Sequence, residues 1–600
     1  MSSRITRRDF LNGVAIAVAG SLSPLELQAA AAYPPARLGL RGAHPGSFEV
    51  AHGLRDGASW EERDIGEEYD LVVVGAGISG LAAAYFYQRD GGGSTLLLDN
   101  HDDFGGHAKR NEFSVDGRQL IGFGGTMLVE APGDYPQVAA DLIAELGVDT
   151  ERLHQAFDQQ LYQDLSRGTF LDRRAFGRDH LAVGPLGEVL KDLPVPDAAR
   201  EELKRLAAND RHYLNDMSRA EQIAYLDQTT YEAYLRDRAG IGAEARRVIS
   251  ALPRGVWAIG IDALPARTAW SSGYPGFGDL ELDAEPYSAY DDRLFHFPDG
   301  NASIARLLVR RMIPRVAPGS SMDDIVTARF DYAQLDQPNA PVRLRLNSTV
   351  VRVRHEKETT GPVRVTYVRD GRAHTVKARR VVLACYHAMV PALCPELPAP
   401  QQGHLRSCLR APLVYTNVAI RNWRAFAKLG LRRADCPASY FHNVMLDFPV
   451  SLGDYRFAAS PDEPILLHLN RVPGQPGLSA AAQFAAGKRE LLETPFSTFE
   501  HHVRDQLGRM LGSAGFDPDR DIAAITVNRW PHGYAYGYDR KSGQVAFEPS
   551  RWPEARHSWR GASTRFGQIS FAGTDAASNA MTEAAIEEAY RAVQDLKAGP

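Results

Sequence analysis

The pattern of apolar positions predicts a β-strand, a helix and a second β-strand between residues 69 and 99. Residues 71–74 (LVVV) form an unbroken apolar run, which is typical of a strand buried on both faces of a parallel sheet. The helix-forming run LAAAYFYQRD follows at 81–90 and ends at three glycines, 91–93. A further apolar run at 95–98 leads to Asp99. This order predicts a βαβ unit.

A different pattern, strict alternation, occupies residues 278–286 (GDLELDAEP). If this segment is a strand, all its carboxylates lie on one face. Such a face favours the capture of a polycationic substrate. The alternative is a solvated edge strand or loop, in which acids prevent pairing with other strands. The acids are Asp279, Glu281, Asp283 and Glu285.

Between the first strand and the helix the spacing is GxGxxG, with Gly75, Gly77 and Gly80. In a dinucleotide site the first glycine makes the tight turn, the second lets the backbone approach the diphosphate, and the third lets the helix pack closely. The helix begins around Ile78 and Ser79, and its free N–H groups would face the phosphates. Asp99 lies 19 positions after Gly80, where an acid can reach the ribose hydroxyls. The alternative is a glycine-rich turn in a purely structural βαβ unit.

Length, charge and cysteine content limit the classes of function that this chain can have. The chain has 600 residues, too many for one hydrophobic core, so we expect at least two domains. A net charge of −6 and the absence of a basic run argue against a nucleic-acid partner. Beyond the N-terminal segment no apolar run approaches the ~20 residues that a bilayer span needs. The four cysteines form no CxxCH motif, which removes the signature of c-type haem, and they are too few for a disulfide framework.

The first residues have the form of an export signal. Arg7 and Arg8 precede a short, mildly apolar stretch and then small residues near 29–32. Together with Phe10 and Leu11 the pair resembles the twin-arginine signals of bacteria, which implies export of a folded chain to the periplasm by the twin-arginine machinery. The alternative is an ordinary Sec signal.

Five further segments resemble the flavin-containing amine oxidase and dehydrogenase superfamily: 121–130 (IGFGGTMLVE), 295–308 (FHFPDGNASIARLL), 347–356 (NSTVVRVRHE), 378–390 (ARRVVLACYHAMV) and 569–593 (ISFAGTDAASNAMTEAAIEEAYRAV). A glycine pair one turn after Asp99 belongs to the same resemblance. The resemblance implies FAD, bound non-covalently since no cysteine lies near the aromatic segment, with a nicotinamide enzyme as the alternative. It assigns these further residues to the flavin site: Gly105, Gly106, His107, Gly124, Gly125, Thr126, Val351, Gly573, Asp575, Met581 and Thr582.

This resemblance implies an α/β fold, in which a Rossmann-like FAD-binding domain of the amine oxidase type is joined to a discontinuous α+β substrate domain. We expect a signal peptide at 1–32 and an N-terminal arm at 33–68. The FAD-binding domain then comprises 69–130, 298–390 and 560–600, and the substrate domain 131–297 and 391–559. The flavin ring would lie at the seam of the two domains, where pockets commonly form.

An aromatic segment, RWPHGYAYGYD at 529–539, is the candidate wall of the substrate site. The resemblance implies aromatic rings that stand over the flavin and flank an amine. Such faces tolerate a cation and exclude water. Trp530, Tyr534 and Tyr536 are the candidates, although Ala580 stands where the superfamily usually places a second ring. The alternative is that these rings pack along a strand.

The predicted arm contains two histidines, His44 and His52, which are candidate axial ligands for a b-type haem. Histidines beside glycine and proline are otherwise surface or capping groups. Haem, or an external acceptor, would remove electrons from the flavin.

These observations predict a periplasmic FAD-dependent dehydrogenase that oxidises a polyamine. An amino-acid oxidase would need an arginine for the substrate carboxylate, and a desaturase would need an apolar pocket. A flavoprotein without catalytic activity is the alternative from a different functional class.

Overall fold

The structure is a computed structural model that describes residues 33–282, 293–538, 545–546 and 552–598. Its strands form a seven-stranded sheet, a nine-stranded sheet and a separate two-stranded hairpin, β4 (Arg110–Val115) with β5 (Arg118–Phe123). The predicted signal segment, 1–32, lies outside the described residues.

The seven-stranded sheet contains the predicted βαβ unit. Its path is β8-β3-β2-β11-β10-β9, with β18 beside β11. β2 pairs in parallel with β3 on one side and β11 on the other, and Leu71, Val72 and Val73 have no solvent exposure. The predicted strand is therefore confirmed, although it begins earlier, at Asp64. The strands are β2 (Asp64–Val74), β3 (Thr95–Leu98), β8 (Val342–Arg345), β9 (Thr349–His355), β10 (Val363–Arg369), β11 (Arg372–Leu383) and β18 (Ile569–Phe571).

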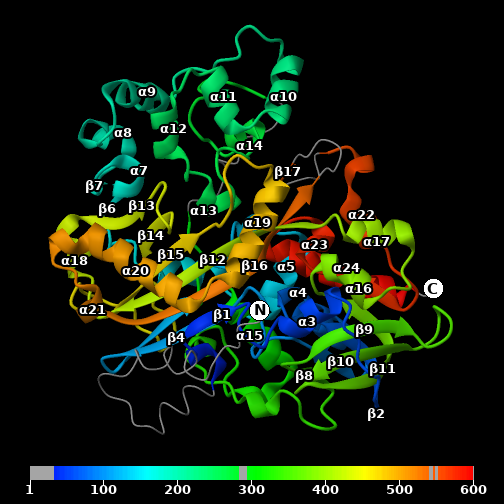
Figure 1. The fold of residues 1–600 in the computed structure, drawn as a ribbon. Helices are drawn as coiled ribbons and strands as arrows, with labels where there is room; N and C mark the ends of the chain where they lie inside the picture. The colour runs from blue at the N-terminus through cyan, green and yellow to red at the C-terminus, as the bar shows by residue number, and fades with distance from the viewer. Residues whose placement is uncertain (1–32, 283–292, 539–544, 547–551, 599–600) are drawn as a thin grey trace.

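Two helices from opposite ends of the chain pack together on this sheet. The ring of Phe86 in α4 (Ile78–Arg89) lies 5.3 Å from that of Tyr590 in α24 (Thr582–Lys597), edge to face. Figure 1 shows the two helices side by side, one blue and one red, near α5 (Gln137–Glu145) and α15 (Ala302–Met312). The last segment of the chain therefore completes the core begun by the first βαβ unit.

The nine-stranded sheet follows the order β1-β16-β12-β15-β14-β13-β6-β7, with β17 beside β16. Its strands are β1 (Gly39–Gly42), β6 (Ser166–Leu171), β7 (His180–Val183), β12 (Leu409–Ile420), β13 (Leu431–Asp435), β14 (Asn443–Leu446), β15 (Ile465–Arg471), β16 (Ile522–Tyr538) and β17 (Val545–Ala546). One face is apolar: Val414, Leu469 and Val444 pack in a core with α20 (Phe496–Leu511). Because side chains alternate along strands, the intervening residues face the other way.

A group of short helices lies beyond the end of this sheet, at the top of Figure 1. They are α9 (Asp197–Ala208), α10 (Arg219–Gln228), α11 (Tyr231–Asp237), α12 (Ala243–Ile249), α13 (Arg254–Trp257) and α14 (Ala266–Ser271). Their apolar residues share one core with Trp530 and Tyr536 of the sheet. We call this group the helical lobe.

Of the two interpretations of 278–286, the strand does not hold for the part that the structure describes, because residues 278–282 form no strand, and the solvated loop agrees with it. The alternation instead reflects burial in the helical lobe. Leu280 and Leu282 enter its core, and Trp270 Nε1 donates a hydrogen bond to the Leu280 carbonyl at 2.9 Å. Asp279 and Glu281 face solvent. Asp283 and Glu285 lie outside the described residues.

The N-terminal arm connects the two sheets. β1 pairs in parallel with β16 of the nine-stranded sheet. From the same strand Arg41 donates two hydrogen bonds, both 2.8 Å, to Asp102, which follows the first βαβ unit. Burial would raise the pKa of Asp102, but hydrogen bonds from His44 and Arg41 hold it well below its usual range. The arm therefore contacts both sheets and connects them.

Candidate functional site

The glycine turn adopts the conformation that its sequence predicts. Gly75 has φ of +104°, and a Cβ there would lie 2.6 Å from the Ala384 carbonyl oxygen. A Cβ on Gly80 would lie 1.9 Å from the Gly75 oxygen, so only glycine lets α4 pack this closely. Gly77 forms a parallel bridge with Gly105, which brings the two glycine motifs together.

Asp99 lies at the carboxyl end of β3, beside this turn. Its carboxylate accepts hydrogen bonds from the Ala76 N–H at 2.7 Å and the His101 N–H at 2.8 Å. Burial raises the pKa of Asp99. The turn and the acid therefore have the arrangement of a dinucleotide site, and no side chain fills the approach at Gly77, where a Cβ would make only ordinary contact with Gly106 at 3.7 Å.

A cavity of about 540 Å³ begins at the glycine turn and reaches the nine-stranded sheet. Its volume is within the usual range for a small-molecule site. These residues predicted from the sequence line it: Gly75, Gly77, Ile78, Ser79, Asp99, Gly105, Gly106, His107, Gly125, Thr126, Trp530, Tyr534, Gly573, Met581 and Thr582. Segments separated by up to 500 positions in the chain therefore converge on one cavity.

Three of the predicted residues, Gly80, Gly124 and Val351, do not line the cavity. Gly80 packs against the turn, as described above. Gly124 accepts a hydrogen bond from Trp530 Nε1 at 2.7 Å, which fixes the aromatic segment against the 121–130 segment. Val351 is buried within β9.

Asp575, which the resemblance assigns to the flavin site, is not among the residues that line the cavity. Its carboxylate accepts 2.9 Å hydrogen bonds from Arg410 Nε and from the His387 N–H. Burial would raise the pKa of Asp575, but Arg410 and His387 lower it. Arg410, which sequence reasoning missed, lines the cavity in its place.

Among the predicted aromatic residues the structure separates Tyr534 from Tyr536. Tyr534 lines the cavity, and its hydroxyl lies 3.0 Å from that of Tyr415 in β12. Tyr536 is buried elsewhere and stacks on Phe484 at 5.7 Å. Tyr415 is thus the second ring beside Tyr534, contributed by a neighbouring strand rather than by the position of Ala580.

Two carboxyl groups that were not predicted also line the cavity, Glu130 and Glu583. Glu583 is the second residue of α24, and its Oε2 is buried without a hydrogen-bond partner. Burial raises the pKa of Glu583 to about 7 and also raises the pKa of Glu130. A substrate ammonium group would stabilise the charged form of both. Glu130 is the last residue of segment 121–130, whose glycines carry the family resemblance. Its place beside that motif was therefore a signal in the sequence for a residue of this site.

The two arginines of the cavity are each paired with an acid. Arg410 binds Asp575, the Thr574 hydroxyl at 2.6 Å and the Gly533 carbonyl at 2.9 Å. Arg433 donates to Asp435 at 3.0 and 3.2 Å. Each guanidinium charge is therefore balanced within the protein.

A sequence profile of the NAD(P)-binding Rossmann-like domain matches residues 73–146. No curated protein sequence matches the chain. Among solved structures, a putrescine oxidase bound to putrescine aligns with 90% of this chain and 100% of its own, with a TM-score of 0.51 and 16% sequence identity. A putrescine oxidase from a redesign of cofactor binding aligns with 89% and 99%, with a TM-score of 0.52 and 17% identity.

The chain has the putrescine oxidase fold. The expectation of an α/β architecture with a Rossmann-like domain is thereby confirmed. In this fold, residues that follow β2, β3 and β11 of the seven-stranded sheet line one side of the cavity, and residues of the nine-stranded sheet line another.

The candidate haem ligands do not fit that role. Both ring nitrogens of His44 face protein oxygens, Nδ1 the Pro45 carbonyl at 2.9 Å and Nε2 the Asp102 carboxylate at 3.2 Å. The ring of His52, in α3 (Glu49–Arg55), lies 5.1 Å from that of Phe48 at an interplanar angle of 51°. The described ranges contain no cluster of three or more residues suited to hold a metal ion. We derive no step through haem.

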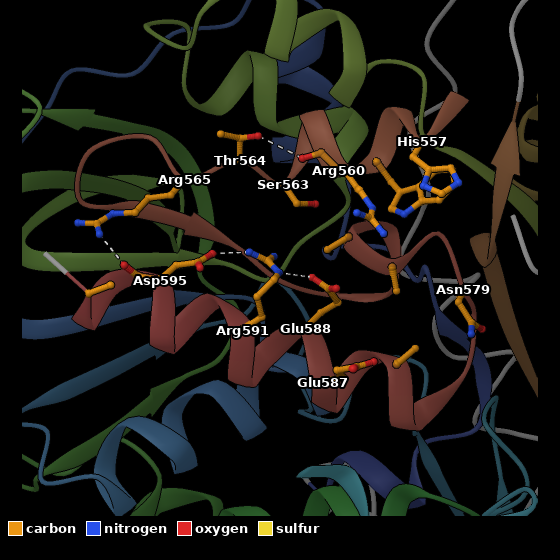
Figure 2. Close-up of a pocket in the computed structure, with 15 residues that line it drawn as sticks. His557, Arg560, Ser563, Thr564, Arg565, Asn579, Glu587, Glu588, Arg591 and Asp595 are labelled. Atoms are coloured by element: carbon orange, nitrogen blue, oxygen red, sulfur yellow. Dashed lines mark hydrogen bonds and ion pairs between the residues drawn. The ribbon is translucent and has the colours of Figure 1, made fainter. Parts of the chain in front are cut away.

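A second pocket, of about 910 Å³, lies on the other side of α24. Figure 2 shows Arg591 between Glu588 and Asp595, which pair with it at 2.6 and 2.5 Å. Asn579 lines this pocket whereas Ala580 lines the first, so the approach to α24 separates the two. Because its central charges pair with one another and no predicted site residue lines it, we assign the chemistry to the first cavity.

Proposed function

We propose that this chain is an FAD-dependent dehydrogenase that oxidises a polyamine. The observation that carries the proposal is the composition of one cavity. A dinucleotide-type glycine turn lies at one end, and the rest of the lining includes Tyr415, Tyr534, Glu130 and Glu583 among apolar side chains. The fold of an enzyme solved with putrescine bound supports the same class of substrate.

The glycine turn, Asp99 and the start of α24 would hold FAD. The glycines leave room for a diphosphate beside free N–H groups, and the positive end of the α24 dipole would face the pyrimidine edge of the flavin. FAD, when bound, accepts a hydride from the carbon next to the substrate nitrogen. This choice of FAD over a nicotinamide cofactor rests on the resemblance of the five segments named above.

The chain's own residues would bind and orient the amine. Glu130 and Glu583 attract its ammonium groups, and Tyr415 and Tyr534 exclude water around the reacting carbon. The reacting nitrogen must be neutral to release hydride, which a dry aromatic wall favours. The amine loses a hydride and a proton, and water then cleaves the resulting imine to an aldehyde and an amine.

The pairing of both cavity arginines argues against an amino-acid substrate. A carboxylate would have to compete with Asp575 for Arg410 or with Asp435 for Arg433.

The specific substrate that we propose is spermidine. The export signal, the flavin segments and RGAHPGSFEVAH at 41–52 together resemble bacterial spermidine dehydrogenase. Its products would be an aminoaldehyde and 1,3-diaminopropane, with electrons passed to an external acceptor. The resemblance also implies haem, which His44 and His52 do not support.

The decisive experiment is anaerobic reduction of the purified yellow protein across a panel of substrates. We expect spermidine or another polyamine to bleach the flavin absorbance. Bleaching by an amino acid or a carotenoid precursor alone would overturn the proposal. No reduction by any member of the panel would favour a flavoprotein without catalytic activity.

We also propose export of the folded, FAD-loaded chain through the twin-arginine pathway. The double substitution Arg7→Lys and Arg8→Lys should retain the protein in the cytoplasm, because the pathway reads the arginine pair. Unchanged delivery to the periplasm would refute this route. In the residues that the structure describes, no helix has the length and apolar character of a membrane span.

A further inference from the structure

Three side chains form a row across the floor of the cavity. Tyr415 in β12 is directly opposite Asn470 in β15, and Asn470 is directly opposite Asn443 in β14. Directly opposed residues of antiparallel strands place their side chains on the same face. All three residues line the cavity. We call them the polar row.

The two asparagines of this row lack hydrogen-bond partners. Oδ1 of Asn443 and Oδ1 of Asn470 are both buried and unpaired, and Asn443 is only 3% exposed. An unpaired buried amide oxygen destabilises the protein, so a ligand that supplies an N–H group removes this penalty when it binds.

The neighbouring polar side chain in the cavity shows that this deficit is local. His468, two residues before Asn470 in β15, contacts Asn417 Oδ1 at 2.7 Å and Asp447 Oδ1 at 2.6 Å. Both ring nitrogens of His468 thus face a protein oxygen, whereas the amide oxygens of Asn443 and Asn470, which also line the cavity, have no partner.

The spacing of the polar row suits a chain with more than one nitrogen. Neighbouring strands lie about 4.8 Å apart, so the row offers hydrogen-bonding groups at intervals of about 5 Å. This interval is close to the separation of two nitrogens joined by three methylenes. Because Arg433 is paired with Asp435, its charge does not exclude a cation from this end of the row.

We propose that Asn443 and Asn470 form a subsite that accepts N–H hydrogen bonds from a second amino group of the substrate, so that the enzyme selects linear diamines and polyamines over monoamines. This inference rests on the proposed amine oxidation. As a consequence, Glu130, Glu583 and the tyrosines bind one part of the substrate. The asparagines bind the second amino group, so only a substrate long enough to place that group there gains this contact.

The test compares spermidine with n-butylamine in the holoenzyme. Asn443→Ala and Asn470→Ala should each raise the KM for spermidine at least tenfold, with kcat within about twofold and the KM for n-butylamine unchanged. Asn443→Asp retains an oxygen acceptor and adds charge, so it should restore spermidine binding. Asn422→Ala, on the loop after β12, is the matched control and should change neither constant.

Equilibrium calorimetry of spermidine binding to the oxidised holoenzyme, without turnover, gives an independent readout. We expect Kd to rise at least tenfold in the alanine variants. Should an alanine variant fail to fold, Asn443→Leu, of similar size, carries the same test. Equal losses for spermidine and n-butylamine, or unchanged Kd, would overturn the subsite.

The two proposals fail differently. If no amine reduces the flavin, the proposed function is wrong, and spermidine binding that weakens in Asn443→Ala still supports the subsite. If amines reduce the flavin but the parent enzyme treats n-butylamine and spermidine alike, the function stands and the subsite is wrong.

Discussion

The two ends of the cavity are built on different principles. At the glycine turn the contacts come from the backbone, and three glycines within six positions, 75–80, shape the approach. At the polar row the contacts come from side chains on three strands, at positions 415, 443 and 470. The glycine turn depends on the absence of side chains, and the polar row depends on the hydrogen-bonding groups of its side chains.

This difference decides how each end can be recognised and how each should respond to substitution. At Gly75 and Gly80 the turn has no room for an added Cβ, because its geometry is set by close approach of main-chain groups. At the polar row, a side-chain substitution should leave the fold intact but reduce the selectivity for substrate. The predictions test this contrast in order of expected effect, beginning with the N-terminal arm, which contacts both sheets.

The largest effect is expected at Asp102, where the arm meets the nucleotide-binding sheet. Asp102→Asn leaves the buried guanidinium of Arg41 without its counter-charge, which should lower the free energy of unfolding by about 3–5 kcal/mol. Denaturation in urea measures the loss. Asp56→Asn, which removes a solvent-exposed pair with Arg55, is the control and should leave the midpoint unchanged. Equal behaviour of the two variants would show that the arm does not hold the sheets together.

The next effect concerns the glycine turn itself. Gly80→Ala places a Cβ 1.9 Å from the Gly75 oxygen, so we expect a loss of about 3 kcal/mol and a protein that no longer retains flavin. Absorbance of the purified protein and urea denaturation measure both. Gly403→Ala in α17 (Ala399–Leu405) meets no atom within 4 Å and should stabilise the fold by about 0.5–1 kcal/mol. A yellow, stable Gly80→Ala protein would contradict the backbone account.

A smaller effect is expected at Glu583, between the two ends. Since its pKa is about 7, the carboxylate forms as pH rises from 6 to 8, while a substrate ammonium stays protonated. The KM for spermidine should therefore fall roughly tenfold over this interval, equivalent to about 1.4 kcal/mol. Glu583→Gln should flatten the profile, and Glu587→Gln, on the exposed side of α24, should preserve it. A pH profile that survives in Glu583→Gln would assign the titration to another group.

The smallest effect is expected at the tyrosine pair beside the polar row. Tyr415→Phe or Tyr534→Phe removes one 3.0 Å hydrogen bond and should cost about 1 kcal/mol of stability. The double variant should cost less than the sum of the singles, because both remove the same bond. Strict additivity in chemical denaturation would mean that the hydroxyls do not interact.

Sequence reasoning reached the glycine turn, Asp99 and the terminal helix because each obeys a local rule. At the acidic segment it left a strand and a loop open, and the alternation there comes from two leucines packed in the helical lobe. At His44 it could not anticipate that Nε2 faces the Asp102 carboxylate, 58 positions away. No local sequence motif marks Tyr415, Arg410, Asn443 or Asn470. Glu130 follows the glycines of a recognised segment, but its place in the cavity was not predicted.

The sequence by itself determined that a dinucleotide turn forms at 75–80, because a buried strand, glycines at the required spacing and a helix-forming run are all adjacent in the chain. Only the tertiary structure decided what faces that turn. Strand order and register bring Tyr415, Asn470 and Asn443 into one row, and these depend on contacts between residues tens of positions apart. No local spacing encodes such contacts, because each strand reads only as an alternation of inward and outward residues until its neighbours are known.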